Sequence, residues 1–287
     1  MIRRIVILLS GTASDEGACT AAVTLAKRLG AVVEGLYIKI DPSELMFRLG
    51  EGVAATAIDD ILKSAEKEAD AAAIRGRAVL ENAARNFGLS LLPDEPAGAG
   101  AGAIMRSVQG PAMDVLTEEL GLADLVVFGE PGDQAPIDLL PKIEHTLMHL
   151  RRPILIARGR VGSSFGDKIL VPFNGTVEAC SALSGAAEIV TKASAIEVLT
   201  LRESEEDDGA STRAVRYIAL YGARAIVQQQ APSGRGIGED IATRASVIGA
   251  DLVVMGGYGR SRLRELVLGG ATRHMLNHSP VPVLLAH

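Results

Sequence analysis

The feature that most constrains the fold of this chain is an internal repeat. The segment ADLVVFGEPG at residues 123–132 returns as ADLVVMGGYG at residues 250–259. In the same order, PILIA at 153–157 is matched by PVLLA at 282–286. Self-similarity over such a distance indicates two copies of one folding unit rather than a single large domain.

The starts of the two halves correspond as well. IVILLSGT at residues 5–12 parallels ILVPFNGT at residues 169–176. The segment between the copies, GRVGSSFG at 159–166, is rich in Gly and Ser and is typical of a short linker. We therefore predict two domains, residues 1–158 and residues 167–287.

Within each copy, apolar runs of strand length alternate with helical patterns. In the second copy, strands are predicted at 168–173, 195–201, 225–229, 251–255 and 281–286, with helices at 178–191, 212–221 and 238–248 and a last helix after Gly269-Gly270. Short continuous apolar strands between helices indicate a parallel sheet that is covered on both faces. The predicted fold class is α/β, with two tandem doubly wound (Rossmann-like) domains, each a mostly parallel five-stranded sheet with helices on both faces.

The first copy differs from the second by a long insertion, residues 42–88, between its second and third strands. This segment is rich in Ala, Glu and Lys and is predicted to form one or two long helices. The stretch LPDEPAGAGAGA at 92–103 follows it, and we expect a flexible spacer there.

Composition narrows the classes of partner. Aromatic residues make up 3% of the chain and Trp is absent, so the stacking surfaces typical of single-strand nucleic-acid binding are not expected. A net charge of −6 gives no basic surface for nucleic acid or an anionic membrane. The short apolar run after the first residues is interpreted as a buried strand and not as a signal peptide. Cys19 and Cys180 have no metal or disulfide spacing and are predicted to be reduced core thiols of a cytoplasmic protein.

A glycine-rich segment, GGYGRSRLRELVLGGAT at residues 256–272, follows the apolar run DLVVM directly. In parallel α/β sheets, ligands bind at the carboxyl ends of the strands, where this segment must lie. The pair Gly269-Gly270 precedes a helical pattern, and a helix start with free backbone N–H groups is suited to bind an anion. Ordinary turns and a helix cap are the alternative explanation. The segment matches neither the dinucleotide pattern G-x-G-x-x-G nor the P-loop.

The spacing G-x-x-G, nine residues, then Gly and a small residue resembles the nucleotide signature of the universal stress protein family. The Gly-Thr after the first strand and the final PVPVLLA also resemble that family, in both halves, so the chain is similar to a tandem universal stress protein. For the ATP-binding branch, the resemblance implies adenine near the ends of strands one and two, ribose beside the first motif glycines, and phosphates at the Gly-Gly helix start.

The resemblance thus implies a site for ATP or a related adenine nucleotide, accompanied by Mg²⁺, in the second half, and no catalytic residue. The residues that it implies are Pro172, Phe173, Asn174, Leu201, Met255, Gly256, Gly259, Arg260, Gly269, Gly270, Ala271 and Thr272. Two of them depart from the family pattern, which usually has Asp at the position of Asn174 and a hydroxyl residue at that of Gly270. Loss of one neutral hydrogen bond weakens binding by about twofold to tenfold.

In the first copy, Leu140-Pro141 stand where the second copy has Gly269-Gly270. We expect the Leu side chain to fill the phosphate position, and Pro141 has no N–H to donate. The first half is therefore predicted not to bind nucleotide and to serve as a structural or partner-facing half.

Other charged and polar groups of the sequence have simpler interpretations. Arg260, Arg262 and Arg264 are typical of a solvated face, although Arg260 adjoins the motif. The pairs His145/His149 and His274/His278 have metal-like spacing, but no carboxylate accompanies them and no metal site is predicted.

The leading functional hypothesis is a stress-response module that binds a nucleotide as a signal, acts on a protein partner not identified by the sequence, and hydrolyses ATP slowly at most. Glu265 is the only carboxylate of the glycine segment, and it stands in the middle, so no general base is evident. A second hypothesis is an interaction protein with a vestigial pocket. A third hypothesis is an ATP pyrophosphatase, prompted by SGTASD at 10–15, but this segment lacks the second Gly that such a phosphate loop requires.

The apolar C-terminal strands of the two halves are predicted to pair as an internal pseudo-dimer, and association of two chains is left open.

Overall fold

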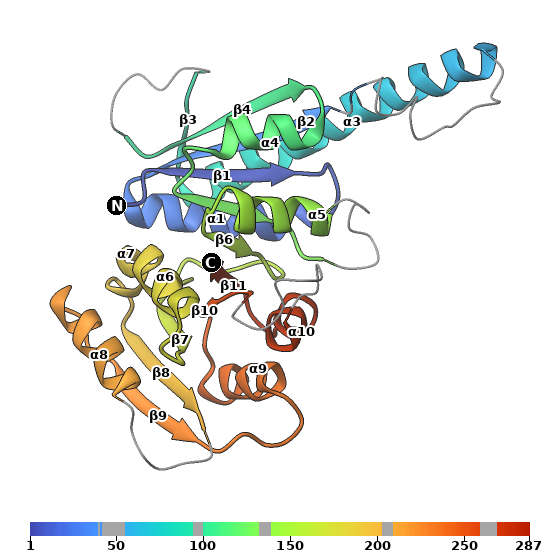
Figure 1. The fold of residues 1–287 in the computed structure, drawn as a ribbon. Helices are drawn as coiled ribbons and strands as arrows, with labels where there is room; N and C mark the ends of the chain where they lie inside the picture. Colours follow the sequence, from blue (N-terminus) through green and yellow to red (C-terminus); the bar gives the residue numbers. More distant parts are fainter. Residues whose placement is uncertain (40, 42–54, 94–99, 132–138, 203–208, 259–268) are drawn as a thin grey trace.

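The structure is a computed structural model of the 287-residue chain (Figure 1). It describes residues 1–39, 41, 55–93, 100–131, 139–202, 209–258 and 269–287. The strands are β1 (Arg4–Leu9), β2 (Val32–Lys39), β3 (Ser90–Leu91), β4 (Gly102–Gln109), β5 (Leu125–Phe128), β6 (Ile154–Ile156), β7 (Lys168–Pro172), β8 (Ala195–Leu201), β9 (Ile226–Gln230), β10 (Leu252–Gly256) and β11 (Val283–Ala286).

The helices lie between the strands along the chain, and some of their ends carry signals that the sequence encodes. They are α1 (Asp15–Leu29), α3 (Ala55–Phe87), α4 (Ala112–Leu120), α5 (Leu139–Glu144), α6 (Val177–Gly185), α7 (Ala187–Val190), α8 (Ala210–Leu220), α9 (Ile237–Ile248) and α10 (Gly270–His278), with a π-helical turn η1 (His145–His149). Helix α1, for example, has acidic residues in its first turn, basic residues in its last turn, and Gly30 as a left-handed C-cap at φ 71°.

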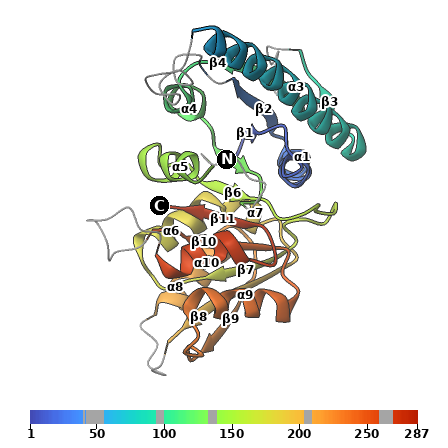
Figure 2. The same cartoon turned by 90° about the vertical axis from the view of Figure 1, so that its right-hand side faces the viewer.

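All strands of the described residues lie in one sheet, in the order β3-β4-β2-β1-β5-β6-β11-β10-β7-β8-β9. Neighbours are parallel except at one place, where β6 and β11 pair antiparallel with Leu155 opposite Leu284. The strand order of the second half, from β11 to β9, mirrors that of the first half, from β6 to β4. The expected pair of doubly wound units is therefore present, and Figure 2 shows the two units meeting along β6 and β11.

The two five-stranded units are joined through their C-terminal strands. The halves share a single eleven-stranded sheet, because the terminal strand of each half completes its edge hydrogen bonds on the other. The first half also has a sixth strand, β3, of two residues, which pairs parallel with β4.

Alternate residues along the strands belong to two apolar cores, one on each face of the sheet. Ile5 and Ile7 of β1 belong to the first core, whereas Val6 and Leu8 belong to the second. Helices α1, α3, α6, α7 and α8 cover the first core, and α4, α5, η1, α9 and α10 cover the second. This arrangement explains the near-continuous apolar strands, since both faces of a parallel sheet are buried.

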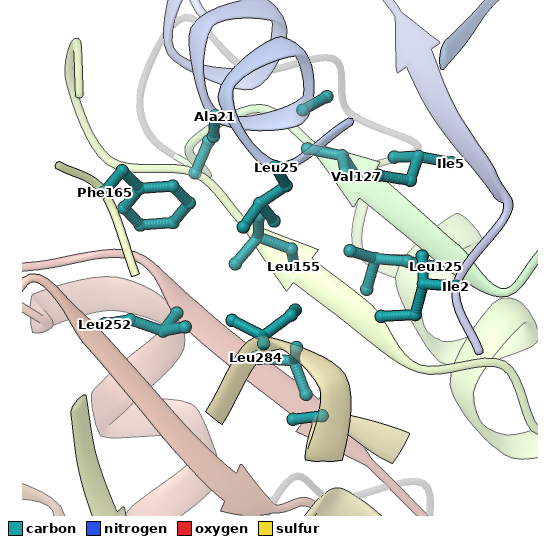
Figure 3. Packing of buried hydrophobic residues seen from close by; sticks show 14 of the residues in the cluster. Ile2, Ile5, Ala21, Leu25, Leu125, Val127, Leu155, Phe165, Leu252 and Leu284 are labelled. Atoms are coloured by element: carbon teal, nitrogen blue, oxygen red, sulfur yellow. The ribbon is translucent and has the colours of Figure 1, made fainter. Parts of the chain in front are cut away.

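The first core runs without interruption across the junction of the halves. Figure 3 shows Leu155 of β6 between Leu25 of α1 and Leu284 of β11, with Phe165 of the linker to one side of them. Phe165 is 2% exposed, so the linker is packed at this point. The guanidinium of Arg28 donates to the Phe165 carbonyl oxygen over 2.7 Å. The two halves are thus joined by a common core as well as by a common sheet.

The repeated Asp of the ADLVV motif has a structural role. In the first half, Asp124 Oδ2 accepts hydrogen bonds from the backbone N–H groups of Arg3 and Arg4 at the start of β1. In the second half, the Asp251 carboxylate accepts them from Gly166, Asp167 and Lys168 at the start of β7. The carboxylate satisfies donors that precede the first sheet bond of each strand, which accounts for its recurrence.

One expectation for a helical segment needs correction. The helix expected at 178–191 is two helices, because the chain leaves the helical conformation at Ala186. Of the insertion 42–88, residues 55–87 form the single helix α3, and residues 42–54 lie outside the described residues. The expected spacer at 92–103 ends earlier than predicted, because Gly102 and Ala103 already belong to β4. Among the described helices, none combines the length and the apolarity that crossing a bilayer requires.

Candidate functional site

A cavity of about 320 Å³ lies at the carboxyl ends of β7, β8 and β10, against the start of α10. This is the edge at which doubly wound sheets bind ligands. Ten of the twelve residues that the sequence singled out line it: Pro172, Phe173, Asn174, Leu201, Met255, Gly256, Gly269, Gly270, Ala271 and Thr272. The other two, Gly259 and Arg260, lie outside the described residues.

Six further lining residues were not singled out from the sequence. They are Thr176, Glu178, Ala179, Leu199, Ile237 and Ile241. Ile237 and Ile241 belong to the first turns of α9, which packs beside α10 and closes the apolar side of the cavity. Their helical spacing of four marked them as core residues, and nothing in the sequence shows that this face borders a cavity.

The glycine at the end of β10 is required by packing. A Cβ atom placed on Gly256 would lie 2.6 Å from the backbone N of Ala179 and 2.6 Å from the backbone C of Glu178, at the start of α6. The first half repeats this contact, because a Cβ on Gly129 would lie 2.7 Å from Ser14 Oγ. Glycine at these two positions therefore lets the first helix of each half approach the sheet, whether or not a ligand binds.

The glycines at the start of α10 have no such explanation. A Cβ placed on Gly269 or Gly270 meets no described atom within 4 Å, and both residues are exposed. Gly269 has an ordinary φ of −54°, and neither residue has a positive φ. Glycine at the start of a helix gives no stability of its own, so the packing of the described residues supplies no reason for this pair. What glycine provides here is open space beside the backbone N–H groups of the first turn, which have no acceptor within the helix.

Thr272 and Tyr258 connect the two ends of the glycine segment. The Tyr258 N–H donates to Thr272 Oγ1 over 3.4 Å, and Thr272 is buried. Tyr258 adopts a left-handed conformation with φ 62°, which is uncommon for a residue with a side chain. Its hydroxyl donates to Glu144 Oε1 in the first half over 3.4 Å. Burial, assisted by the Glu144 carboxylate, raises the pKa of Tyr258, so the phenol keeps its proton at neutral pH.

Asn174 is held by its own turn. Its Oδ1 accepts hydrogen bonds from the Thr176 N–H over 3.2 Å and from the Thr176 hydroxyl over 3.0 Å. The Thr176 hydroxyl in turn accepts from the Ala179 N–H and caps α6. With its oxygen engaged in this way, Asn174 offers a ligand its NH₂ group, which is a donor where an Asp would be an acceptor.

Glu178 brings a carboxylate to the cavity. Its Oε2 is shielded from solvent and accepts no hydrogen bond from any described residue. An unpaired carboxylate oxygen is unfavourable, because it has lost water without gaining a donor. A ligand that carries hydroxyl or amino donors, or a cation, is suited to this side of the cavity.

The corresponding place in the first half differs in its chemistry. Leu140 and Pro141 lie in the first turn of α5, where Pro141 removes one backbone N–H. The Leu140 side chain is exposed, at 40%, as are the glycines at the start of α10, whereas the preceding Leu139 is buried. The first half thus lacks the donor and the open glycine pair at this helix start.

The remaining candidate residues serve other purposes. His145 and His149 stack with their ring centroids 5.1 Å apart, and His145 Nε2 lies 3.0 Å from the Thr117 hydroxyl. No cluster of three or more His, Cys, Asp or Glu suited to a metal ion occurs within the described residues. Cys19 is buried, as predicted, but Cys180 is exposed, so the prediction of a second core thiol was wrong.

Comparison with known proteins identifies the family of the second half and the fold of the whole chain. Residues 166–287 match the model of the universal stress protein family. The second half of the chain is a universal stress protein domain. No curated protein sequence shows a significant match to the chain.

The universal stress protein fold extends over the whole chain. A universal stress protein from Archaeoglobus fulgidus DSM 4304 has a similar structure, with a TM-score of 0.67 at 15% identity, over 99% of this chain and 97% of that one. A putative universal stress protein from Pseudomonas aeruginosa UCBPP-PA14 gives a TM-score of 0.57 at 16% identity, over 99% of this chain and 93% of that one. At these identities the similarity shows a common two-domain fold.

Proposed function

We propose that the second half of this chain binds an adenine nucleotide, ATP or a relative of it, and that the protein is a binding module of the stress response rather than a fast enzyme. The observation that carries the proposal is the pair Gly269-Gly270. It is exposed, none of the described residues requires glycine there, and it stands at the start of α10 on the rim of a largely apolar cavity. A helix start with uncovered N–H groups favours a phosphate by hydrogen bonding and by the helix dipole.

The rest of the cavity suits the other parts of such a ligand. Leu199, Leu201 and Met255 give an apolar surface that an aromatic base can cover. The free NH₂ group of Asn174 can donate to a ring nitrogen of the base. On the opposite side, the Glu178 carboxylate can accept from ribose hydroxyls or hold a Mg²⁺ ion that accompanies the phosphates. Adenine in particular is inferred from the family resemblance.

A binding role is favoured over rapid hydrolysis by the shortage of acid–base groups. Among the described lining residues, Glu178 is the only one with an acidic or basic side chain. Fast hydrolysis needs a positioned base and charge stabilisation at the leaving group. We therefore infer that nucleotide occupancy acts as a signal, read by a protein partner in the cytoplasm.

The test is calorimetric titration of the full chain with ATP, with and without Mg²⁺, beside the variants Gly269→Leu and Asn174→Ala. Saturable binding that Gly269→Leu abolishes, while its melting temperature stays within about 2 °C of the parent, supports the proposal. Equal binding by parent and Gly269→Leu refutes this location of the phosphate site.

An interaction protein with an unused pocket is the alternative, and the engagement of the Asn174 oxygen by Thr176 favours it. Mass spectrometry of small molecules released from the purified protein separates the two. A stoichiometric adenine nucleotide excludes the unused pocket, whereas no bound nucleotide and no calorimetric signal at millimolar ATP excludes the nucleotide module.

A further inference from the structure

A second cavity, of about 520 Å³, lies between α6 and α8 on the other side of the β7 end. Helix α6 and the loop before it supply most of the wall, and α8 supplies the rest. Its described lining residues are Phe173, Gly175, Val177, Cys180, Ser181, Leu183, Ser184, Arg213, Ala214 and Tyr217. Phe173 lines both cavities and separates them.

The internal repeat shows that the fold does not require this opening. In the first half, α1 and α3 occupy the places of α6 and α8, and they pack closely along their length. A Cβ on Gly11 would lie 2.5 Å from Ala72 Cβ, and Arg75 Nε donates to the Gly11 carbonyl oxygen over 2.9 Å. Cys19 of α1 is fully buried by this contact, whereas Cys180, at the aligned position of α6, is exposed.

The side chains on the second helix of each half differ in size at aligned positions. Helix α8 approaches Gly175 through Ala210, just as α3 approaches Gly11 through Ala72. One turn further along each helix, α3 has Gly76, whose Cβ would lie 3.4 Å from Leu9. At the aligned position α8 has Ala214, and Tyr217 follows it. Tyr217 also contacts Tyr221, with the two hydroxyls 3.2 Å apart.

The described wall of this cavity has several apolar side chains and one charged side chain. Phe173, Val177, Leu183 and the Tyr217 ring are apolar, and Val177 is left 67% exposed. None of the described lining residues is Asp or Glu, and Arg213 is the only one with a fixed charge. Arg213 has an interaction of its own in the structure, so an arriving anion would share its guanidinium, whose fork provides several donors.

The phenol of Tyr217 adds no negative charge. Burial, followed by the hydrogen bond with Tyr221, raises the pKa of Tyr217 to about 12. The wall is therefore apolar with a single positive group, in contrast to the first cavity, which carries the Glu178 carboxylate. Cavities of 300 to 1,000 Å³ with an apolar wall and a few polar groups are typical of small-molecule sites.

We propose that the cavity between α6 and α8 binds a small amphipathic anion, an aliphatic or aromatic carboxylate or sulfonate, with its apolar body against Phe173 and Leu183 and its acid group at Arg213. This site is separate from the nucleotide site and does not depend on it. Its ligand covers Cys180, which makes that thiol a natural reporter.

The experiment uses the full chain and two fluorescent probes that share the same aromatic rings, anilinonaphthalene sulfonate and the uncharged N-phenyl-1-naphthylamine. We expect one anionic probe per chain, displaced by decanoate. Arg213→Gln should weaken the sulfonate about tenfold and change the uncharged probe less than twofold, because only the charge-assisted contact is lost. Ser181→Trp fills the cavity and should abolish both signals, while Ser246→Trp, on the exposed face of α9, should leave both unchanged.

Thiol alkylation gives an independent measurement on the unmodified protein. In the native chain one thiol, Cys180, should react with iodoacetamide, and saturating decanoate should slow that reaction at least fivefold. Unchanged alkylation, probe binding that Ser181→Trp leaves intact, or an equal effect of Arg213→Gln on both probes would each overturn the proposal.

Discussion

A pair of substitutions, Gly256→Ala and Gly270→Ala, distinguishes glycines that serve the fold from glycines that serve a ligand. Each adds one methyl group to the wall of the same cavity. At Gly256 the new Cβ would lie 2.6 Å from two backbone atoms of α6, so either α6 or β10 must move. At Gly270 it meets no described atom within 4 Å.

The two changes should act in opposite directions on stability. Overpacking of this kind costs about 1–3 kcal/mol, which lowers the melting temperature by roughly 2–5 °C in a chain of this size. Gly270→Ala instead adds a better helix former to the first turn of α10 and should raise the unfolding free energy by about 0–1 kcal/mol.

Their effects on binding should differ as well. In Gly270→Ala the methyl group lies at the approach to the N–H groups without the hydroxyl donor that the family pattern has at this position, and loss of one charge-assisted hydrogen bond should weaken ATP about 10- to 150-fold. Scanning calorimetry without ligand and titration with ATP measure the two quantities on the same samples. If Gly270→Ala is destabilised as much as Gly256→Ala, or if it binds ATP as the parent does, the assignment of roles to these glycines is wrong.

Three further predictions concern single side chains. Glu178→Gln removes the carboxylate from the cavity and should lower the dissociation constant of Mg²⁺-free ATP about threefold to tenfold, measured by titration in EDTA. An unchanged affinity would place the phosphates elsewhere. Arg158→Ala removes a buried guanidinium that pairs with Glu130 and donates to carbonyl oxygens of α10. It should lower the free energy of unfolding in urea by about 2 kcal/mol, whereas Arg160→Ala, at an exposed ion pair, should lower it by less than about 0.5 kcal/mol. Burial raises the pKa of Asp251 above 3.8, so the folded state holds this proton more tightly, and the contribution of the carboxyl group to stability falls as the pH rises just above 3.8. Asp251→Asn should remove this slope from the free energies of urea unfolding measured between about pH 3.5 and 6. An identical slope in both proteins would contradict the assignment.

Much of the fold could be predicted from the sequence, because a doubly wound unit is encoded locally. The two ADLVV segments became β5 and β10, and the apolar run 195–201 became β8 without a change of bounds. The break at Ala186 and the two-residue strand β3 were missed. Both depend on the tertiary surroundings and have no local signal that distinguishes them from a continuous helix or a loop.

The sequence motif predicted the location of the candidate site but not the role of each glycine in it. The pattern located ten lining residues on three strand ends and one helix start, but it did not separate Gly256 from Gly270, since both appear as glycine beside a strand or helix end. The distinction lies in what approaches each Cα, and in this chain that neighbour is Ala179, more than seventy residues away in sequence from Gly256. Likewise, the exposure of Cys180 depends on where α8 settles, which the sequence around Cys180 does not encode.

The antiparallel junction of β6 and β11 has a consequence for synthesis on the ribosome. Ile156 of β6 is made about 130 residues before its partner Val283, which at roughly 5–20 residues per second is an interval of about 6–25 seconds. Throughout that interval the first half can fold its parallel unit, but β6 presents an apolar strand with unpaired backbone groups. The nascent first half is therefore the state of this protein most prone to pair with another nascent chain, and a chaperone that shields a strand edge would act at that stage.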